Sequence, residues 1–350
     1  MNDHTLKELS EQLGISPSTI SRALSGRDLK RSGARQRAEQ IRAMAARLGY
    51  EPNSVARSLK TNRRQIVGLI IPDILNDYYA TAATFVQETL SAEGYRVILC
   101  ATNDDPATEA AHMRVLREER VAGIVTVPCP RDSSSRGNSR VEVQAPTVEL
   151  VRQGAAQNFD AVLIDDINAG SQGTQHLINL GHRQIAILTG PASVSTSQQR
   201  LEGYQQTLKK AGIPLDASLV RSGPYRRDAA CASTLELMDR RQRPTALIAT
   251  SNELVIGVLQ ALTQRQIQVP DELSLVGFGN ADWFPLLRPA LTTVALPIRE
   301  MAMVAVHMLL TRIRAGDNEG NEAEMGTTPV ISRYQTHLIV RDSTRPPATF

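Results

Sequence analysis

Short apolar runs alternate with longer amphipathic stretches from residue 65 onward, and this alternation constrains the fold more than any other feature of the sequence. Runs such as IVGLII at 66–71 and IAILT at 185–189 predict buried strands. The stretches between them carry helical periodicity, and regular strand–helix alternation favours parallel, doubly wound sheets. Two such sets follow one another, so we expect two Rossmann-like α/β lobes with a cleft between them.

The individual elements can be placed by residue number. The expected strands are 66–71, 95–100, 123–127, 147–151, 161–165, 185–189, 246–249 and 273–277, and the expected helices are 77–93, 107–119, 167–180, 197–211, 226–239, 253–265 and 297–314. A polar segment at 131–145 interrupts the pattern, and we expect it to be shortened or without regular structure.

The N-terminal residues predict a different, all-helical unit. Residues 5–13 have leucines at helical spacing, Gly14 ends that helix, and Ser16 followed by Pro17 begins a second one. Two short helices around such a turn form a helix-turn-helix, whose second helix enters the DNA major groove. Arg22 suits a bidentate contact to guanine. The candidate DNA-contacting residues are Thr5, Ser16, Pro17, Ser18, Thr19, Ser21 and Arg22.

Charge is distributed unevenly along the chain. Residues 1–64 contain 13 Lys and Arg against 6 Asp and Glu, whereas the remainder contains 26 against 30. A basic head on a mildly acidic body indicates that the head meets a polyanion.

A short helix is expected between head and body, at residues 55–60. So short a helix is unstable alone in water and needs a support on which to fold. Leu59 would then be exposed between basic residues, as suits a wedge into a minor-groove base step. The candidate contacts here are Asn53, Ala56, Arg57, Leu59 and Lys60; the alternative is a flexible linker with an incidental leucine.

Several motifs resemble those of the LacI/GalR family in order and spacing. They are TLKELSEQLGISPSTISRALSG at the N-terminus, LGYEPNSVARSLKTNRRQIVGLIIPD, GHRQIAILTGP, RPTALIATSNELVIG, QVPDELSLVGF and LRPALTTV. The resemblance covers nearly the whole chain. It implies a transcriptional repressor with a periplasmic-binding-protein-like body, acting as a homodimer on near-palindromic double-stranded operator DNA. It also implies a small-molecule effector, which could act as inducer or corepressor.

The resemblance also divides the chain. We expect a helix-turn-helix domain at 1–49, a hinge helix and linker at 50–64, and an effector-binding and dimerisation domain at 65–345. Within the last, lobe 1 would comprise about 65–165 and 293–325, and lobe 2 about 166–292 and 326–345. The tail shows no heptads, which favours a dimer over a tetramer.

Effector contacts are expected just past the strands, because ligands of open α/β sheets bind at the carboxyl ends of the strands. Aromatic, amide and arginine side chains gather there and suit a polar, polyhydroxylated or anionic molecule. Alternative roles are a surface ion pair for Arg200 and lobe packing or dimer contact for the two adjacent tyrosines. The resemblance implies Tyr78, Tyr79, Thr196, Arg200, Tyr225 and Asn252 as effector contacts, and position past the strands adds Arg152, Asp282 and Trp283.

One departure from the family bears on the effector. Gly279 stands where the family usually has an aspartate, while Arg152, Arg200 and Arg226 lie near the expected cleft. We therefore expect a positive pocket that favours a sugar acid of the gluconate type over a neutral sugar or purine, unless Asp165 or Asp282 restores the charge.

Other classes of protein are disfavoured. The sequence has no GxGxxG or Walker motif after the first strand, and no HExxH or GxSxG motif. Its histidines also lack the spacing of metal ligands. We therefore expect that the protein is not an enzyme and binds no cofactor or metal. Cys100, Cys129 and Cys231 are too far apart in sequence to suggest a zinc site. No membrane span or signal peptide is expected, which favours a cytoplasmic protein. A transport-type solute-binding protein is the alternative that shares the body fold.

Overall fold

The computed structural model describes residues 6–24, 32–47, 65–130, 145–154, 157–316 and 328–348. The chain divides into two compact units, Met1–Arg64 and Gln65–Phe350, here called the head and the body. Among the described residues, no helix combines the length and the apolar character that a membrane crossing requires.

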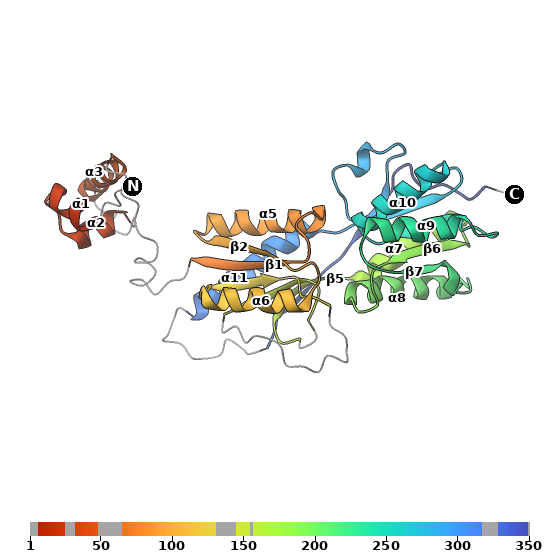
Figure 1. Ribbon diagram of the computed structural model, residues 1–350, viewed down its shortest axis with the longest axis horizontal. Helices are drawn as coiled ribbons and strands as arrows, with labels where there is room; N and C mark the ends of the chain where they lie inside the picture. Colours follow the sequence, from red (N-terminus) through yellow and green to blue (C-terminus); the bar gives the residue numbers. More distant parts are fainter. Residues whose placement is uncertain are drawn as a thin grey trace. The chain divides into compact units, whose positions relative to one another are not determined.

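The described part of the head contains three helices, α1 (Leu6–Leu13), α2 (Pro17–Leu24) and α3 (Ser32–Arg47) (Figure 1). Gly14, at φ +63°, supplies the left-handed conformation that ends α1. The core is small and consists of Ile20 from α2 with Ile41 and Ala45 from α3. This arrangement agrees with the helical spacing of the apolar residues.

The body has two lobes, each built on a six-stranded sheet. The lobe 1 sheet has the order β11-β5-β4-β3-β1-β2, and all its strands are parallel. Its elements are β1 (Ile66–Ile71), α5 (Asp77–Ala92), β2 (Arg96–Ala101), α6 (Pro106–Glu118), β3 (Gly123–Thr126), β4 (Thr147–Val151), β5 (Asp160–Ile164), α11 (Ile298–Gly316) and β11 (Ile331–Tyr334).

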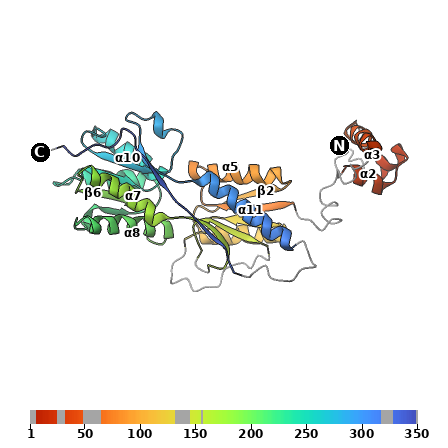
Figure 2. The same cartoon turned by 180° about the vertical axis from the view of Figure 1, so that it is seen from behind.

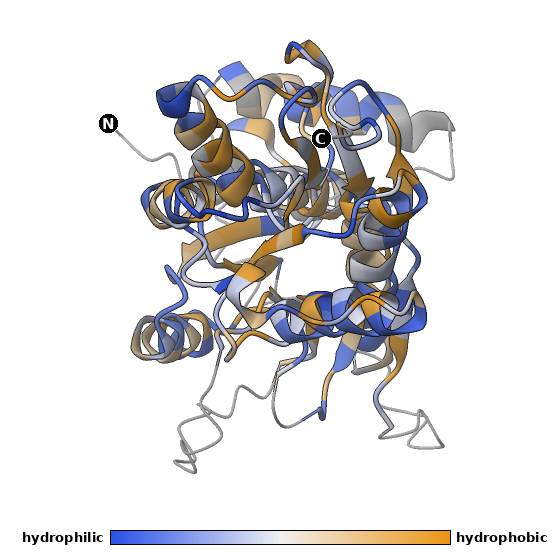
Figure 3. Cartoon of the chain, turned by 90° about the vertical axis from the view of Figure 1, so that its right-hand side faces the viewer, coloured by the Kyte–Doolittle hydropathy of each residue, from blue (hydrophilic) through white to orange (hydrophobic). Residues whose placement is uncertain are grey.

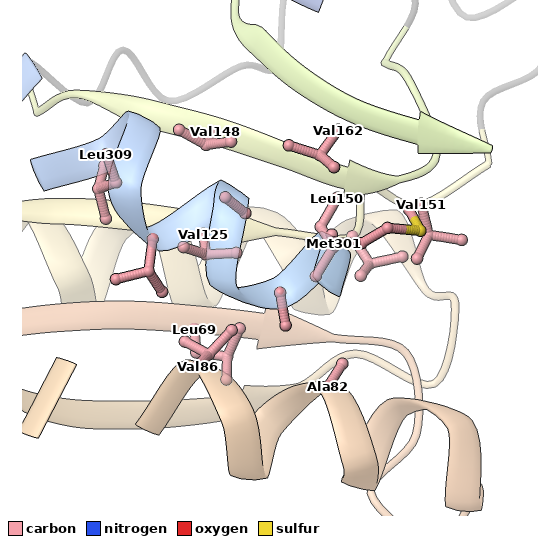
Figure 4. Close-up of a cluster of buried hydrophobic side chains, with 14 of the residues drawn as sticks. Leu69, Ala82, Val86, Val125, Val148, Leu150, Val151, Val162, Met301 and Leu309 are labelled. Carbon is pink, nitrogen blue, oxygen red and sulfur yellow. The ribbon is translucent and has the colours of Figure 1, made fainter. Parts of the chain in front are cut away.

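Two helices cover one face of the lobe 1 sheet. Side chains of α5 and α11 meet those of the central strands in a single buried cluster, which Figure 4 shows around Val86, Met301 and Leu309. Helix α6 covers the opposite face, where Leu116 packs against Ile70 and Ile124. Successive strand residues point to opposite faces, so strands covered on both sides are apolar throughout.

The lobe 2 sheet has the order β12-β10-β9-β8-β6-β7, with only β12 antiparallel among its described strands. One face is covered by α7 and α8 and the other by α9 and α10. Figure 3 shows the apolar residues gathered in the strands and on the helix sides that face them. Its elements are α7 (Asp166–Asn179), β6 (Ile185–Thr189), α8 (Ser195–Lys210), the 3-10 helix Ala217–Leu219, β7 (Val220–Ser222), α9 (Arg227–Met238), β8 (Ala246–Ala249), α10 (Asn252–Arg265), β9 (Ser274–Phe278), the 3-10 helix Phe284–Leu286, β10 (Thr292–Ala295) and β12 (His337–Ile339).

The chain crosses between the lobes three times. The crossovers follow β5, β10 and β11, and the last is visible as the dark blue segment that runs from one lobe to the other in Figure 2. The third crossover lies at Gln335 and Thr336 rather than near residue 325 as the family resemblance implies, because β11 pairs with β5 of lobe 1. The second follows Ala295 rather than Thr292, because the whole of β10 belongs to the lobe 2 sheet.

The predicted fold class is confirmed: a helical head precedes an α/β body of two doubly wound lobes. The segment 131–145, expected to be shortened or without regular structure, and the hinge expected at 50–64 lie outside the described residues, apart from Ala145.

The C-terminal segment is attached to lobe 2 through a buried histidine. Nε2 of His182 lies 2.8 Å from the carbonyl oxygen of Arg345, which can only accept, so Nε2 carries the proton. Nδ1 of His182 lies 2.8 Å from the hydroxyl of Thr245 and accepts from it in the neutral ring. Burial lowers the pKa of His182, and burial and the proximity of His182 lower that of His176, so both rings favour the neutral form.

Acidification should therefore destabilise the body. The unfolded chain takes up protons as the pH falls through about 6.5, whereas the folded chain resists until a lower pH. The contribution of His182 and His176 to the free energy of unfolding is therefore fully present above the ordinary histidine pKa. It is lost as the pH falls through the depressed pKa values of the folded protein. Melting temperatures measured from about pH 8 to pH 5 should fall less steeply for His182→Gln than for wild type. His307→Gln, which changes an exposed histidine, is the control with a wild-type slope; equal slopes in all three proteins would contradict this assignment.

Candidate functional site

A cavity of about 970 Å³ lies between the two lobes of the body. It opens where the strands of both sheets end at their carboxyl termini, the usual binding position in open α/β sheets. The lining combines aromatic rings, prolines, amides and charged groups: Pro72, Asp73, Asn76, Tyr78, Tyr79, Asn103, Asp104, Pro106, Pro130, Val151, Arg152, Pro191, Ser193, Val194, Thr196, Arg200, Pro224, Tyr225, Arg226, Ser251, Asn252, Phe278, Gly279 and Leu296.

Most of the candidate effector contacts come together in this cavity. The structure places Tyr78, Tyr79, Arg152, Thr196, Arg200, Tyr225 and Asn252 in its wall. Asp282 and Trp283 are not among the lining residues. Asp282 is exposed, and the indole nitrogen of Trp283 donates to a carboxylate oxygen of Asp77 at 3.1 Å, which joins a lobe 2 loop to the first turn of α5.

The lobe 2 wall contains a buried ion pair between Arg200 and Asp166. Nε of Arg200 donates to Asp166 at 2.7 Å, and Nη1 donates to the carbonyl of Thr250 at 2.6 Å. Burial opposes the charge on Arg200, but the nearby Asp166 carboxylate outweighs it and raises the arginine pKa. The guanidinium also lies 5.2 Å from the ring centre of Phe278. Arg200 is thus a fixed, fully charged donor.

Two glycines allow α7 and α8 to approach closely enough for this pair to form. A Cβ added at Gly170 would lie 2.1 Å from the carbonyl oxygen of Arg200. A Cβ added at Gly203 would lie 2.0 Å from the carbonyl oxygen of Ile167. Any side chain at these positions would push apart the helices that carry Asp166 and Arg200.

The lobe 1 wall contains a second arginine–aspartate pair. Nη1 of Arg152 lies 2.5 Å from one carboxylate oxygen of Asp104, and Nη2 lies 3.4 Å from the other. Arg152 is only 4 % exposed, and its Nε has no hydrogen-bond partner among the described residues. An unpaired buried donor of this kind can bind a ligand acceptor.

A strained turn directs Arg152 into the wall. Val151 has φ +67°, which is rare for a β-branched residue, and the amide of Arg152 donates to the carbonyl of Leu150 at 2.7 Å. Such a backbone costs about 1–3 kcal/mol and is characteristic of functional sites. The turn ends β4 and redirects the chain at the edge of the cavity.

Three tyrosines supply aromatic surface and hydroxyl groups. Tyr78 and Tyr79 pack edge to face, 5.4 Å apart. The Tyr78 hydroxyl is buried without a partner among the described residues, and burial raises its pKa. Tyr225 lies against Gly190, where a Cβ would meet its ring at 2.2 Å, and its hydroxyl is 2.8 Å from that of Ser197.

The charge of the cavity differs from expectation. Arg152 and Arg200 are paired as described, and Arg226 pairs with Asp228 at 2.7 Å on the surface. Asp73 adds a further negative charge to the wall. Each of the three arginines thus has a carboxylate partner, so the excess positive charge predicted from them is not found. Asp104 and Asp166 lie 48 and 34 residues from their arginines in the sequence, whereas Asp228 lies two residues from Arg226.

In the head, the start of α2 presents a group of hydroxyls. Ser16 accepts from the backbone amide of Thr19 at 3.3 Å, as an N-cap does, and its hydroxyl is 3.0 Å from that of Ser18. Ser16, Pro17 and Ser18 are exposed. Ser21 and Arg22 lie in α2, but their side chains are outside the described part of the structure, as are Thr5, Asn53, Ala56, Arg57, Leu59 and Lys60.

Two functional residues escaped the sequence analysis. Asp104 and Asp166 follow the strands β2 and β5, just as Arg152 follows β4. Applying the same search past those two strands would have found both carboxylates.

Comparisons with known proteins agree with this architecture. Residues 174–344 match the model of the periplasmic binding protein-like domain. The transcriptional regulator DegA of Bacillus subtilis (strain 168) is 30 % identical over 334 residues, which are 95 % of this chain and 98 % of that protein. The chain belongs to the LacI family of transcriptional repressors. LacI-family repressors bind operator DNA and are controlled by small-molecule effectors; they are not enzymes.

Other family members support the same assignment. The ribose operon repressor of Escherichia coli (strain K12) is 29 % identical over 312 residues, covering 88 % of this chain and 93 % of that protein. The crystal structure of the Lac repressor bound to ONPG superposes with a TM-score of 0.82 at 22 % identity, covering 98 % of this chain and all of that chain. The LacI-family fold thus extends over nearly the whole chain.

Removing the Tyr78 hydroxyl should distinguish a binding group from a structural one. Tyr78→Phe eliminates a buried hydroxyl that lacks a partner, so the ligand-free protein should keep or gain stability, by up to about 1–3 kcal/mol. Tyr204→Phe is the matched control, because the Tyr204 hydroxyl donates to Ile185 at 2.8 Å; its loss should cost about 0.5–1.5 kcal/mol. Urea unfolding without ligand measures both, and equal destabilisation by the two variants would contradict the assignment.

Proposed function

We propose that this LacI-family chain is a sequence-specific repressor whose operator affinity is controlled by a polyhydroxylated metabolite in the cleft. The ligand would be a sugar acid of the gluconate type or a sugar. The observation that carries the proposal is the cavity between the lobes, whose wall combines aromatic rings with two residues, Arg152 and Tyr78, that each have a buried polar atom without a partner among the described residues.

The chemistry of the wall supports a ligand rich in hydroxyl groups. A hydroxyl both donates and accepts, so it can serve the unpaired Nε of Arg152, the Tyr78 hydroxyl and the amide of Asn252. Tyrosine rings supply the apolar contact that orients a small ligand. The relative named as a ribose operon repressor also favours a sugar-like ligand.

The head would supply the DNA contacts. We propose a helix-turn-helix domain at 1–49 and a hinge at 50–64 ahead of the effector domain at 65–345. Two chains would pair, so that their heads reach the half-sites of a near-palindrome. Ser18, Thr19 and Arg22 would read the major groove, and Leu59 would open a minor-groove base step once the hinge helix folds on DNA.

Coupling would follow from closure of the cleft. A ligand that contacts Arg152 in lobe 1 and Arg200 in lobe 2 favours the arrangement in which both lobes reach it. A change in the relative position of the lobes alters the spacing of the two hinges, and with it their tendency to fold. Coupling of this kind is typically about 1–3 kcal/mol.

Arg22→Ala tests the DNA-reading role. Loss of a bidentate base contact should weaken operator binding by about 1–3 kcal/mol and relax the preference at one base pair. Arg37→Ala, an exposed substitution in α3, should leave base preference unchanged. Selection of binding sites from random DNA, followed by gel shifts of the variants, measures both effects; an unaltered preference in Arg22→Ala would contradict this role.

Calorimetry on the full chain tests the effector class. D-Gluconate, D-glucose and D-ribose are the probes, with adenine as a ligand without hydroxyls. We expect saturable heat from at least one polyhydroxylated probe, and the same probe should shift operator binding by about 5–150-fold. Binding of adenine alone, or binding of a sugar with no change in gel shifts, would overturn the proposal.

A further inference from the structure

The Arg152 guanidinium uses only one of its edges. Nη1 and Nη2 face Asp104, while the buried Nε lacks a partner among the described residues. The Arg152 side chain is 5 % exposed and that of Asp104 is 33 % exposed. Both residues line the cavity, so the ligand meets the carboxylate of this pair as well as its guanidinium.

The loop that carries Asp104 is held in a defined conformation. Asn103 and Asp104 have φ of +52° and +57°, two successive residues in the left-handed region. The amide of Asn103 donates to the carbonyl of Pro72 at 2.7 Å, and that of Asp104 to the hydroxyl of Thr102 at 3.3 Å. Asp104 is therefore positioned against Arg152 by its backbone and is not an adventitious surface partner.

The pair in lobe 2 is arranged differently. Asp166, the partner of Arg200, is 2 % exposed and is not among the residues that line the cavity. In lobe 2 the ligand therefore meets Arg200 but not the carboxylate of Asp166, which lies outside the cavity wall. On the lobe 1 side it meets a carboxylate beside the arginine, with Asp73 in the same wall.

We propose that Asp104 determines which ligand charge the lobe 1 wall accepts: it occupies Arg152 as an internal carboxylate, so that the wall binds hydroxyl groups and excludes a ligand carboxylate. A hydroxyl accepts from Nε of Arg152 and donates to Asp104 at the same time. A ligand carboxylate would face the Asp104 carboxylate and would have to displace it. This inference rests on the proposed function and narrows its ligand to a neutral polyhydroxylated molecule.

Asp104→Asn in the full chain tests the inference. The amide keeps the shape but leaves Arg152 without a counter-charge, so sodium gluconate and sodium acetate should stabilise the variant in thermal melts. Sodium chloride at equal ionic strength is the reference, and D-glucose is the neutral probe. We expect apparent gluconate affinity at least about tenfold higher than in wild type, because two like charges at contact distance repel strongly.

Two further variants complete the experiment. Asp228→Asn makes the same charge change beside Arg226, another cavity-lining arginine, and should gain no gluconate affinity. Asp104→Asn combined with Arg152→Gln should lose the gain. A gain of similar size in Asp228→Asn, or none in Asp104→Asn, would overturn the inference.

The wild-type protein provides an independent test if Asp104→Asn does not fold. Gluconate and acetate should then stabilise the wild type no more than chloride does, and stronger stabilisation overturns the inference. Wild-type binding of gluconate in preference to glucose would leave the proposed effector class intact and refute only the role of Asp104. If Asp104→Asn gains gluconate affinity while the wild type binds no sugar, the role of Asp104 would stand and the proposed effector class would be refuted.

Discussion

A guanidinium that is taken out of water must be paired, and two such groups are buried in the wall of the cavity between the lobes. Each finds its carboxylate within its own lobe, Arg200 with Asp166 and Arg152 with Asp104. For the Arg200–Asp166 pair, in which both side chains are buried, removing one partner costs about 3–5 kcal/mol. Because both pairs are internal to a lobe, the lobes can move relative to each other without separating either arginine from its carboxylate. The cleft thus has two half-sites, each with its buried arginine neutralised from within its own lobe, and the proposed ligand would bridge them.

The scaffold around these pairs is built for close approach. Gly170 and Gly203 let two helices of lobe 2 touch backbone to backbone, which holds Arg200 in one place. Lobe 1 uses backbone conformation instead, with left-handed residues at Asn103, Asp104 and Val151 on either side of its pair. Conformational strain at these positions is offset by the large apolar cluster beneath them. Rigid placement of a few polar groups is what gives a small site its selectivity.

Much of this architecture could be predicted from the sequence. The period of the apolar residues located the α-helices of the body and eight of its twelve described strands, because strands buried on both faces have a distinctive composition. The strands β7, β10, β11 and β12 were missed, each with only three or four residues. The rule that ligands bind past the strand ends found Arg152, whereas Arg200 and Tyr225 were implied by the family resemblance. Asp104 and Asp166 could have been found past their strands, but their pairing with these arginines could not be predicted, since they are 48 and 34 residues away in the sequence. Pairing over such distances is a property of the folded sheets. The position of the third crossover was missed for a similar reason, as β11 is short and its partner strand, β5, is far away in sequence.

The three crossovers also set an order of assembly during synthesis. Strands β6 to β10 of lobe 2 are continuous in the chain, whereas lobe 1 lacks α11 and β11 until lobe 2 has almost emerged from the ribosome. Through that interval the sheet face formed by Val125, Val148 and Val162 has only α5 to cover it. Exposed apolar surface of this kind recruits chaperones and proteases. A nascent chain that stops short of residue 298 would carry a complete head on a body with an open core, and so would be a substrate for degradation instead of a free DNA-binding fragment.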